Sequence, residues 1–365
     1  MSSTSTAAAE RAVPERVARA SLAHRLLARP ELGSLVGAIA IFIFFFVIAD
    51  PFRQTSSMAT VLYVSSTIGI MAVPVALLMI GGEFDLSAGV NVTASSLFAA
   101  MLSFQLSLNV WAGVLVSLVF ALGIGFLNGF LVMTTKIPSF LVTLGTFLML
   151  QGANIAITKQ VSGQVATDNI SDMDGFSSAR RVFASSFEVG GVSIRVTVLW
   201  WLLFVAIGTW ILLRTRFGNW IFAVGGNVDS ARAVGVPVRQ TKIALFMGVG
   251  LCAWFMGMHR LFAFNTVQSG EGVGNEFIYI IAAVIGGCLL TGGYGSAIGA
   301  AFGALIFGMT NQGIVYAGWE ADWFKFFLGI MLLFATVLNM WVRRLAVHPG
   351  RAPRASARMQ ARRQP

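Results

Sequence analysis

Charged residues are scarce in this chain of 365 residues. Asp, Glu, Lys and Arg make up 11% of it, apolar residues make up 56%, and the mean hydropathy is +0.79. A soluble domain carries roughly 25% charged residues, so this composition excludes a soluble protein. No charged residue lies between Asp85 and Lys136, or between Glu276 and Glu320. Each stretch is long enough for two bilayer crossings of ~20 residues, which predicts an all-α, polytopic membrane protein.

The sequence also lacks the residue patterns of common enzymes. It has no GxxxxGK[ST] phosphate loop, so we expect no ATP hydrolysis by this chain alone. It has no HExxH pattern, and its 3 His and 2 Cys residues do not cluster, so we predict no metal site, no cofactor and no disulfide framework. Cys252 and Cys288 lie in apolar runs, where a thiol behaves as a small hydrophobe. We therefore predict that this chain has no catalytic residues and is not an enzyme.

The basic residues are distributed unevenly along the chain. Nearly half of the 25 Lys and Arg residues precede the first apolar run or follow the last one: Arg11, Arg16, Arg19, Arg25 and Arg29 at the start, and Arg343, Arg344, Arg351, Arg354, Arg358, Arg362 and Arg363 at the end. By the positive-inside rule, both termini are cytoplasmic and the number of spans is even. The tails, residues 1–32 and 343–365, are expected to be disordered in solution. The net charge of +10 resides largely in them, and we predict no nucleic-acid partner.

Ten apolar stretches separated by polar breaks are candidate spans. They cover residues 33–49, 61–80, 88–104, 110–133, 140–157, 196–213, 243–264, 277–290, 297–313 and 323–342. With the N-terminus inside, 18 of the 25 Lys and Arg residues face the cytoplasm. An eight-span arrangement, in which the two glycine-rich stretches after Phe277 do not form two separate crossings, also has an even number and stays open. The predicted transmembrane domain covers residues 33–342.

Two long hydrophilic loops connect these spans. The first, residues 159–195, lies outside in this topology, carries four basic and four acidic residues, and is expected to contain some structure of its own. The second, residues 214–242, lies in the cytoplasm. There Asn227 or Asp229 is placed to cap a short helix that ends at Gly235. Such a helix suits docking to a partner protein, and an ordinary connecting loop is the alternative.

Four segments together resemble one known family. They are GGEFDLSAG at 81–89, NGFLVMTTKIPSFLVTLGT at 128–146, FAVGGNVDSARAVGVPV at 222–238 and a glycine-rich block that ends with GGYGSAIGAAFGALIFG at 292–308. Their type and order are similar to those of the membrane permeases of ribose-type (carbohydrate uptake 2) ABC importers, which carry pentoses, hexoses and related polyols in bacteria. The resemblance covers roughly residues 35–342.

The resemblance implies an architecture and a set of partners. It implies a ten-helix fold related to the vitamin B12 importer, placed in the bacterial inner membrane as one of two permease subunits around a single path. It also implies two cytoplasmic ATPase subunits that hold ATP and Mg, and a periplasmic sugar-binding protein. The cytoplasmic loop would dock on the ATPase, with Gly226, Asn227, Asp229, Ala231, Arg232 and Gly235 as the candidate coupling residues.

The same resemblance suggests where a substrate would pass. A sugar needs hydrogen-bond partners yet must leave quickly, so we expect a weakly polar path. The candidate residues are Asp85, Ser87, Asn91, Asn128, Thr143, Thr146 and Asn311. Two other functions stay open. An ion-coupled secondary transporter would use Glu83, Asp85 and the His259–Arg260 pair as coupling groups. A nucleoside or autoinducer ABC permease would share the architecture and differ in its cargo.

Overall fold

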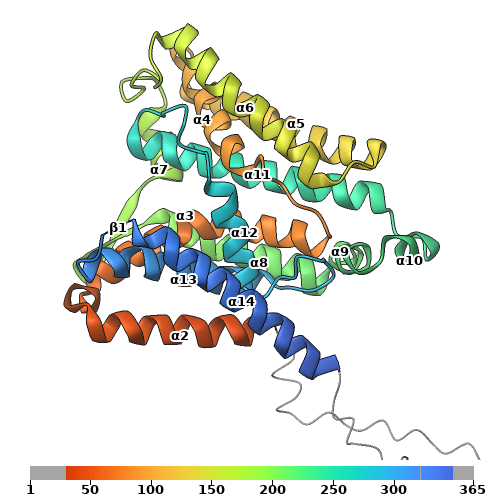
Figure 1. The fold of residues 1–365 in the computed structure, drawn as a ribbon. Helices are drawn as coiled ribbons and strands as arrows, with labels where there is room; N and C mark the ends of the chain where they lie inside the picture. The colour runs from red at the N-terminus through yellow and green to blue at the C-terminus, as the bar shows by residue number, and fades with distance from the viewer. Residues whose placement is uncertain (1–29, 321, 348–365) are drawn as a thin grey trace, which may run out of the picture.

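The chain folds into a bundle in which several of the long helices lie roughly along one direction, while other helices are inclined to them (Figure 1). The computed structural model describes residues 30–320 and 322–347, so the predicted basic tails lie largely outside the described residues. In chain order the helices are α2 (Pro30–Ile48), the 3-10 helix η1 (Asp50–Arg53), α3 (Thr55–Ile80), α4 (Ala88–Gln105), α5 (Val110–Thr135), α6 (Ser139–Ser162), α7 (Phe176–Phe183), α8 (Val196–Arg214), α9 (Arg216–Gly226), α10 (Val228–Ala233), α11 (Val238–Phe264), α12 (Asn275–Ile285), α13 (Ala297–Tyr316) and α14 (Trp323–Val347).

Each of the ten predicted spans contains one of these helices. Within the described residues, 7 helices are long and apolar enough to cross a membrane, namely α2, α3, α5, α6, α8, α11 and α13. Helix α12 and the apolar part of α14 are shorter. The two glycine-rich stretches after Phe277 form separate helices, because residues 286–296 interrupt them. The structure thus confirms an all-α polytopic bundle with about seven long apolar helices and several shorter ones.

Helices α3 and α11 form the centre of the bundle. Their apolar windows are 78% and 67% buried, compared with 17% for α2 and 22% for α6, whose apolar side chains face outward. Small residues allow the central helices to pack closely, as is common in lipid. A methyl group on Gly129 of α5, for example, would lie 2.8 Å from the Cα atom of Ile243 in α11. The outer helices therefore supply the surface available to lipid or to other subunits.

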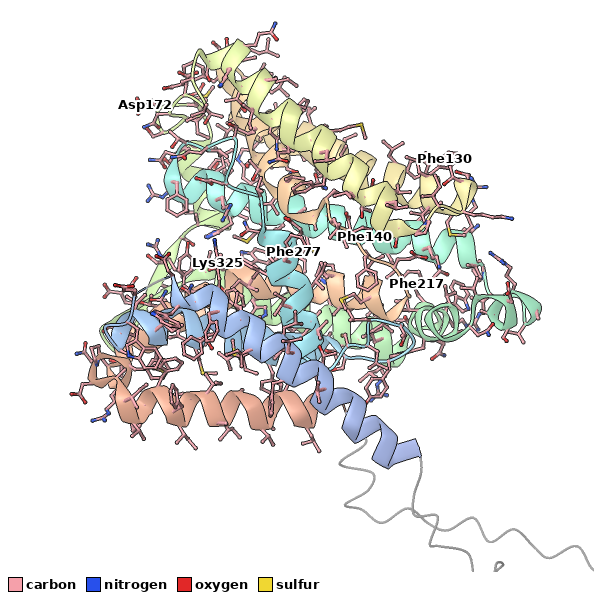
Figure 2. The ribbon with its side chains drawn as sticks, in the orientation of Figure 1. Phe130, Phe140, Asp172, Phe217, Phe277 and Lys325 are labelled. Atoms are coloured by element: carbon pink, nitrogen blue, oxygen red, sulfur yellow. The ribbon has the colours of Figure 1, made fainter. Side chains whose placement is uncertain are left out.

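The two ends of the bundle differ. Helices α9 and α10 lie at one end, together with the start of α2 and the end of α14, as an even number of crossings requires (Figure 1). The opposite end carries α7 and a hairpin in which β1 (Ser186–Val189) pairs antiparallel with β2 (Val192–Arg195). Asp172 lies at this second end and Phe217 at the first (Figure 2). The sequence predicted some structure in this outer loop but not a hairpin, whose turn is the pair Gly190 and Gly191, both with positive φ.

Candidate functional site

A seven-residue break separates α3 from α4. Residues 81–87 form turns and irregular backbone, and Gly82 has a φ of +82° that favours glycine. The first two turns of α6 supply hydrogen-bond partners to this non-helical backbone. Phe84 N donates to Ser139 Oγ at 3.1 Å, and Leu86 N donates to Thr143 Oγ1 at 3.1 Å. Helix α6 therefore satisfies backbone donors that the broken helix leaves without an intrahelical acceptor.

A chain of buried side-chain hydrogen bonds continues from this break into α5 and α6. Asp85 Oδ1 accepts from both the N–H (2.8 Å) and the hydroxyl (2.6 Å) of Ser87. Asn128 of α5 then donates through Nδ2 to Ser87 Oγ at 2.9 Å, and its Oδ1 accepts from Thr146 of α6 at 2.6 Å. All four residues are buried. Because the hydrocarbon region offers no water, such groups are stable there only when they bond to one another.

The structure brings together five of the seven residues predicted to line the path: Asp85, Ser87, Asn128, Thr143 and Thr146. Asn91 lies one turn into α4, where its carbonyl oxygen accepts from Ser95 Oγ at 2.6 Å. Asn311 lies apart on α13, next to Gln312, which donates to it at 3.0 Å. The lining of a path stays a prediction. The clustered polar atoms bond to one another, so contact with a substrate would require this network to open.

Helix α10 is fixed at both ends by the local sequence. Of the two predicted caps, Asn227 occupies the cap position, and its Oδ1 accepts from Ser230 N at 2.8 Å. At the other end, Gly235 has a φ of +82° and donates to the carbonyl oxygen of Arg232 at 3.0 Å. Val236 N donates to the carbonyl oxygen of Ala231, also at 3.0 Å. This bond pair is the Schellman motif, and the expected left-handed glycine is confirmed.

The six predicted coupling residues divide into two groups. Ala231 faces the bundle and packs with the buried Val224 of α9 and Val238 of α11. The other five are exposed at the surface: Gly226, Asn227, Asp229, Arg232 and Gly235. Among them Asp229 pairs with Arg232 at 3.1 Å rather than capping the helix. The α9–α10 unit is thus held to the bundle by apolar contacts and presents glycine, amide and charged groups outward.

Sequence analysis missed a junction of glycine pairs at this end of the bundle. The break (Gly82), the end of α9 (Gly225) and the loop before α13 (Gly292 and Gly293) meet here. A methyl group on Gly225 would overlap the carbonyl oxygen of Ile80 and lie 2.7 Å from Gly293 N. Gly293 N donates to that same oxygen at 2.8 Å. The repeated GG pairs were a visible signal, but only the fold shows that they touch.

A buried ion pair lies beside this junction. Glu83 of the break accepts a hydrogen bond from Lys242 in the second turn of α11, and their side chains are 11% and 9% exposed. Lys242 was not among the predicted site residues. In the sequence it stands beside Arg239 at the end of the basic loop 214–242, where nothing distinguishes it, and only the fold shows that it is buried and paired, as a buried charge must be.

The groups required by a secondary transporter all have partners in this structure. Glu83 pairs with Lys242, and Nη1 of Arg260 lies 3.7 Å from Oε2 of Glu271. The ring nitrogens of His259 lie 3.1 Å from the hydroxyl of Tyr63 and 2.8 Å from the carbonyl oxygen of Phe183. Each candidate coupling group therefore takes part in a contact inside the subunit.

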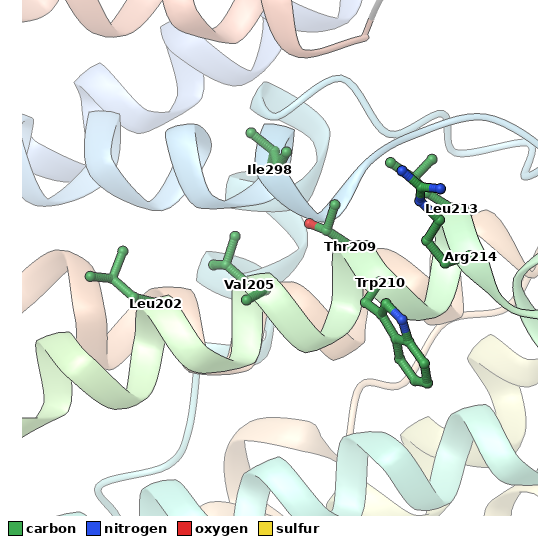
Figure 3. Close-up of a pocket in the computed structure, with 8 residues that line it drawn as sticks. Leu202, Val205, Thr209, Trp210, Leu213, Arg214 and Ile298 are labelled. Carbon is green, nitrogen blue, oxygen red and sulfur yellow. The ribbon is translucent and has the colours of Figure 1, made fainter.

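A groove of about 450 Å³ runs along the outer surface of α8 (Figure 3). Its lining residues are Leu202, Val205, Ala206, Thr209, Trp210, Leu213, Arg214 and Ile298. Sugar sites need several convergent polar groups, and this lining is almost entirely apolar, so it does not suit a sugar. Within residues 30–320 and 322–347, no three or more His, Cys, Asp or Glu side chains group so as to hold a metal ion.

Comparison with known proteins identifies the family. The family described as "Branched-chain amino acid transport system / permease component" matches residues 57–336. The chain belongs to this permease family. The fructose import permease protein FrcC of Rhizobium meliloti is 27% identical over 326 residues, which cover 89% of each chain. The galactose/methyl galactoside import permease protein MglC of Escherichia coli is 29% identical over 84% of this chain and 93% of its own.

A third relative, the probable ABC transporter permease protein YphD of Escherichia coli, is 31% identical over 85% of this chain and 89% of its own. None of the solved structures matches the chain significantly. These findings confirm the resemblance: the chain is a multi-pass inner-membrane permease of the ABC sugar importer family. As a permease component it is a transport subunit and not an enzyme.

Proposed function

We propose that this subunit carries a monosaccharide or a related polyol into the bacterial cytoplasm. A periplasmic sugar-binding protein would deliver the cargo, a second permease subunit would complete the path, and two partner ATPase subunits would bind ATP and Mg. The cargo class rests on relatives whose names state one: fructose, galactose or methyl galactoside, and ribose. These relatives are 26–29% identical to the chain and name three different sugars, so the proposal is a class of cargo and not one sugar.

The observation that supports ATP-driven transport is the α9–α10 unit. It lies at the end of the bundle that the predicted topology assigns to the cytoplasm, is capped by Asn227 and Gly235, and exposes Asp229 and Arg232. A short helix with fixed ends can transmit force without unravelling. Closure of the ATPase subunits would move this unit as a rigid body, and the contact of Gly225 with Ile80 would pass the movement to α3.

The proposed topology has ten crossings. Helix α12 has 11 residues and is therefore ~16 Å long, about half of a ~30 Å hydrocarbon core. The irregular residues 286–296 would complete this crossing, because they reach Ile80 at the cytoplasmic end. Non-helical backbone at membrane depth is tolerated where protein surrounds it, and residues 286–288 are buried.

Reconstitution tests this proposal. The chain would be placed in vesicles with its cognate ATPase and binding protein, and the cargo would be found by thermal stabilisation of the binding protein. The panel would contain pentoses, hexoses, polyols, nucleosides and branched-chain amino acids. We expect ATP-dependent uptake of one sugar or polyol. Uptake by the chain alone in a proton or sodium gradient would establish a secondary transporter, and uptake of a nucleoside or an amino acid would refute the cargo class.

A further inference from the structure

We propose that Glu83 and Lys242 form the joint that passes movement of the α9–α10 unit to the break at residues 81–87. They act as positioning residues that contact neither ATP nor the cargo. This inference rests on the proposed function of α9–α10 as the ATPase-docking element. It adds a specific pair of side chains through which docking would reach the interior of the bundle.

Lys242 is expected to move with α10, because only residues 234–237 separate α10 from α11 and backbone hydrogen bonds hold this connection. Val236 N donates to the carbonyl oxygen of Ala231, and Thr241 N donates to that of Pro237, both within 3.0 Å. Val238 at the start of α11 also packs with Ala231. A displacement of α10 would therefore carry the first two turns of α11, including Lys242, along with it.

Glu83 belongs to a segment that is hydrogen-bonded to helices α5 and α6. The residues that follow it bond to α6 through Phe84 N and Leu86 N, and to α5 through Ser87 and Asn128. A force on Glu83 would thus reach two further helices. The ion pair connects this anchored break to the helix that begins directly after the coupling loop.

The ion pair can resist separation of the two segments, which the steric contact between Gly225 and Ile80 cannot. The close approach of Gly225 to Ile80 is a steric contact, which resists compression and transmits a push. A transport cycle also needs the return movement, and a steric contact opposes separation only weakly. The buried, hydrogen-bonded charges attract each other at reduced dielectric, so the pair can transmit a pull.

The test must separate this role from simple stabilisation of the fold. A single change such as Lys242→Met leaves Glu83 buried without a counter-charge and destabilises the protein by itself. The informative variant is the double change Glu83→Gln with Lys242→Met, which leaves no uncompensated charge. The exchange Glu83→Lys with Lys242→Glu restores an attraction with the signs reversed. The control is Arg239→Met, which removes an exposed cation from the preceding turn of α11, where it lies over the Phe130 ring at 5.3 Å.

The readout is the amount of sugar transported per ATP hydrolysed in reconstituted vesicles, with co-purification of the ATPase measured in parallel. We expect the double variant to insert, to bind the ATPase and to hydrolyse ATP, while its transport per ATP falls by roughly tenfold, a typical size for coupling between sites. The exchange variant should recover most of this loss, and the control should match the wild type.

Several results would contradict the proposed coupling role of Glu83 and Lys242. If the double variant transports as much sugar per ATP hydrolysed as the wild type, the pair only stabilises the fold. If the double variant fails to insert, the exchange variant decides, because an inserted exchange variant that stays uncoupled contradicts a role based on attraction. Failure of the docking function is seen separately, since the wild-type chain would then neither bind nor stimulate the ATPase.

Discussion

Two adjacent glycines at the end of α9 provide a sharp test of the glycine junction. A methyl group on Gly225 would meet two backbone atoms, the oxygen of Ile80 and the nitrogen of Gly293, which cannot rotate away. A methyl group on Gly226 would have no atom within 4 Å. The same chemical change at neighbouring positions of one helix should therefore have opposite effects on stability.

The magnitudes follow from two opposing terms. Replacing glycine by alanine in a helix stabilises it by up to ~1 kcal/mol, and by less near a helix end. Forcing a methyl group into a close-packed site costs about 1–3 kcal/mol. We expect Gly225→Ala to lower the free energy of unfolding by about 1–2 kcal/mol, because the steric term exceeds the helical one. Gly226→Ala should leave it unchanged or raise it by less than ~1 kcal/mol.

The assay is equilibrium unfolding of the purified subunit in mixed micelles, followed by tryptophan fluorescence as the denaturing detergent is increased. Both variants share the loss of glycine flexibility and the same added volume, so each controls for the other. Equal stabilities, or a larger loss for Gly226→Ala, would mean that α9 does not pack against α3 at this position. The close contact that transmits a push would then be absent.

Three further predictions concern the buried network, the coupling loop and the topology. Asn128→Ala removes two hydrogen bonds worth ~0.6 kcal/mol each in a membrane and leaves a cavity, so it should cost about 1–3 kcal/mol in the same unfolding assay. Asn311→Ala should lower the free energy of unfolding by less than ~0.5 kcal/mol, because substitutions outside a buried network usually stay within that range. Equal losses of stability for the two variants would contradict the network. Gly235→Val destabilises the left-handed conformation, with its φ of +82°, by ~1 kcal/mol or more. ATP hydrolysis and uptake should therefore fall together while membrane insertion stays normal. Normal hydrolysis and uptake would mean that the loop is an ordinary connection. In sealed cells, an impermeant thiol reagent should label Ser177→Cys and not Ser230→Cys, and the reverse pattern would refute the topology.

The fold was largely predictable because its strongest determinant is composition. Long stretches without charge and an uneven distribution of Arg require membrane helices with a definite orientation, and every predicted stretch contains a helix. The hairpin at residues 186–195 was missed because strands of four residues give almost no alternating pattern. That α12 ends at Ile285, before the end of the predicted stretch 277–290, was missed for another reason: a half-helix followed by irregular backbone is as apolar as a full span.

The candidate site was predictable only where its contacts are local. Asn227 and Gly235 fix α10 through neighbours a few residues away, so their positions in the sequence indicated their conformations. Asn128 stood out as a polar residue at membrane depth, but its bonds to Ser87 and Thr146 depend on helix packing. The pairing of Glu83 with Lys242 leaves no local pattern, because the two residues are 159 positions apart.

That separation also governs how the protein can be assembled during synthesis. At about 5–20 residues per second, Lys242 leaves the ribosome on the order of 10–30 s after Glu83. Until α6 and α11 arrive, Phe84 N, Leu86 N and the Glu83 carboxylate lack the partners they have in the finished bundle. Since hydrocarbon does not tolerate unsatisfied polar groups, this segment must remain at the aqueous interface during that interval. The break between α3 and α4, although made early, can therefore take its place in the bundle only after α11 has been made.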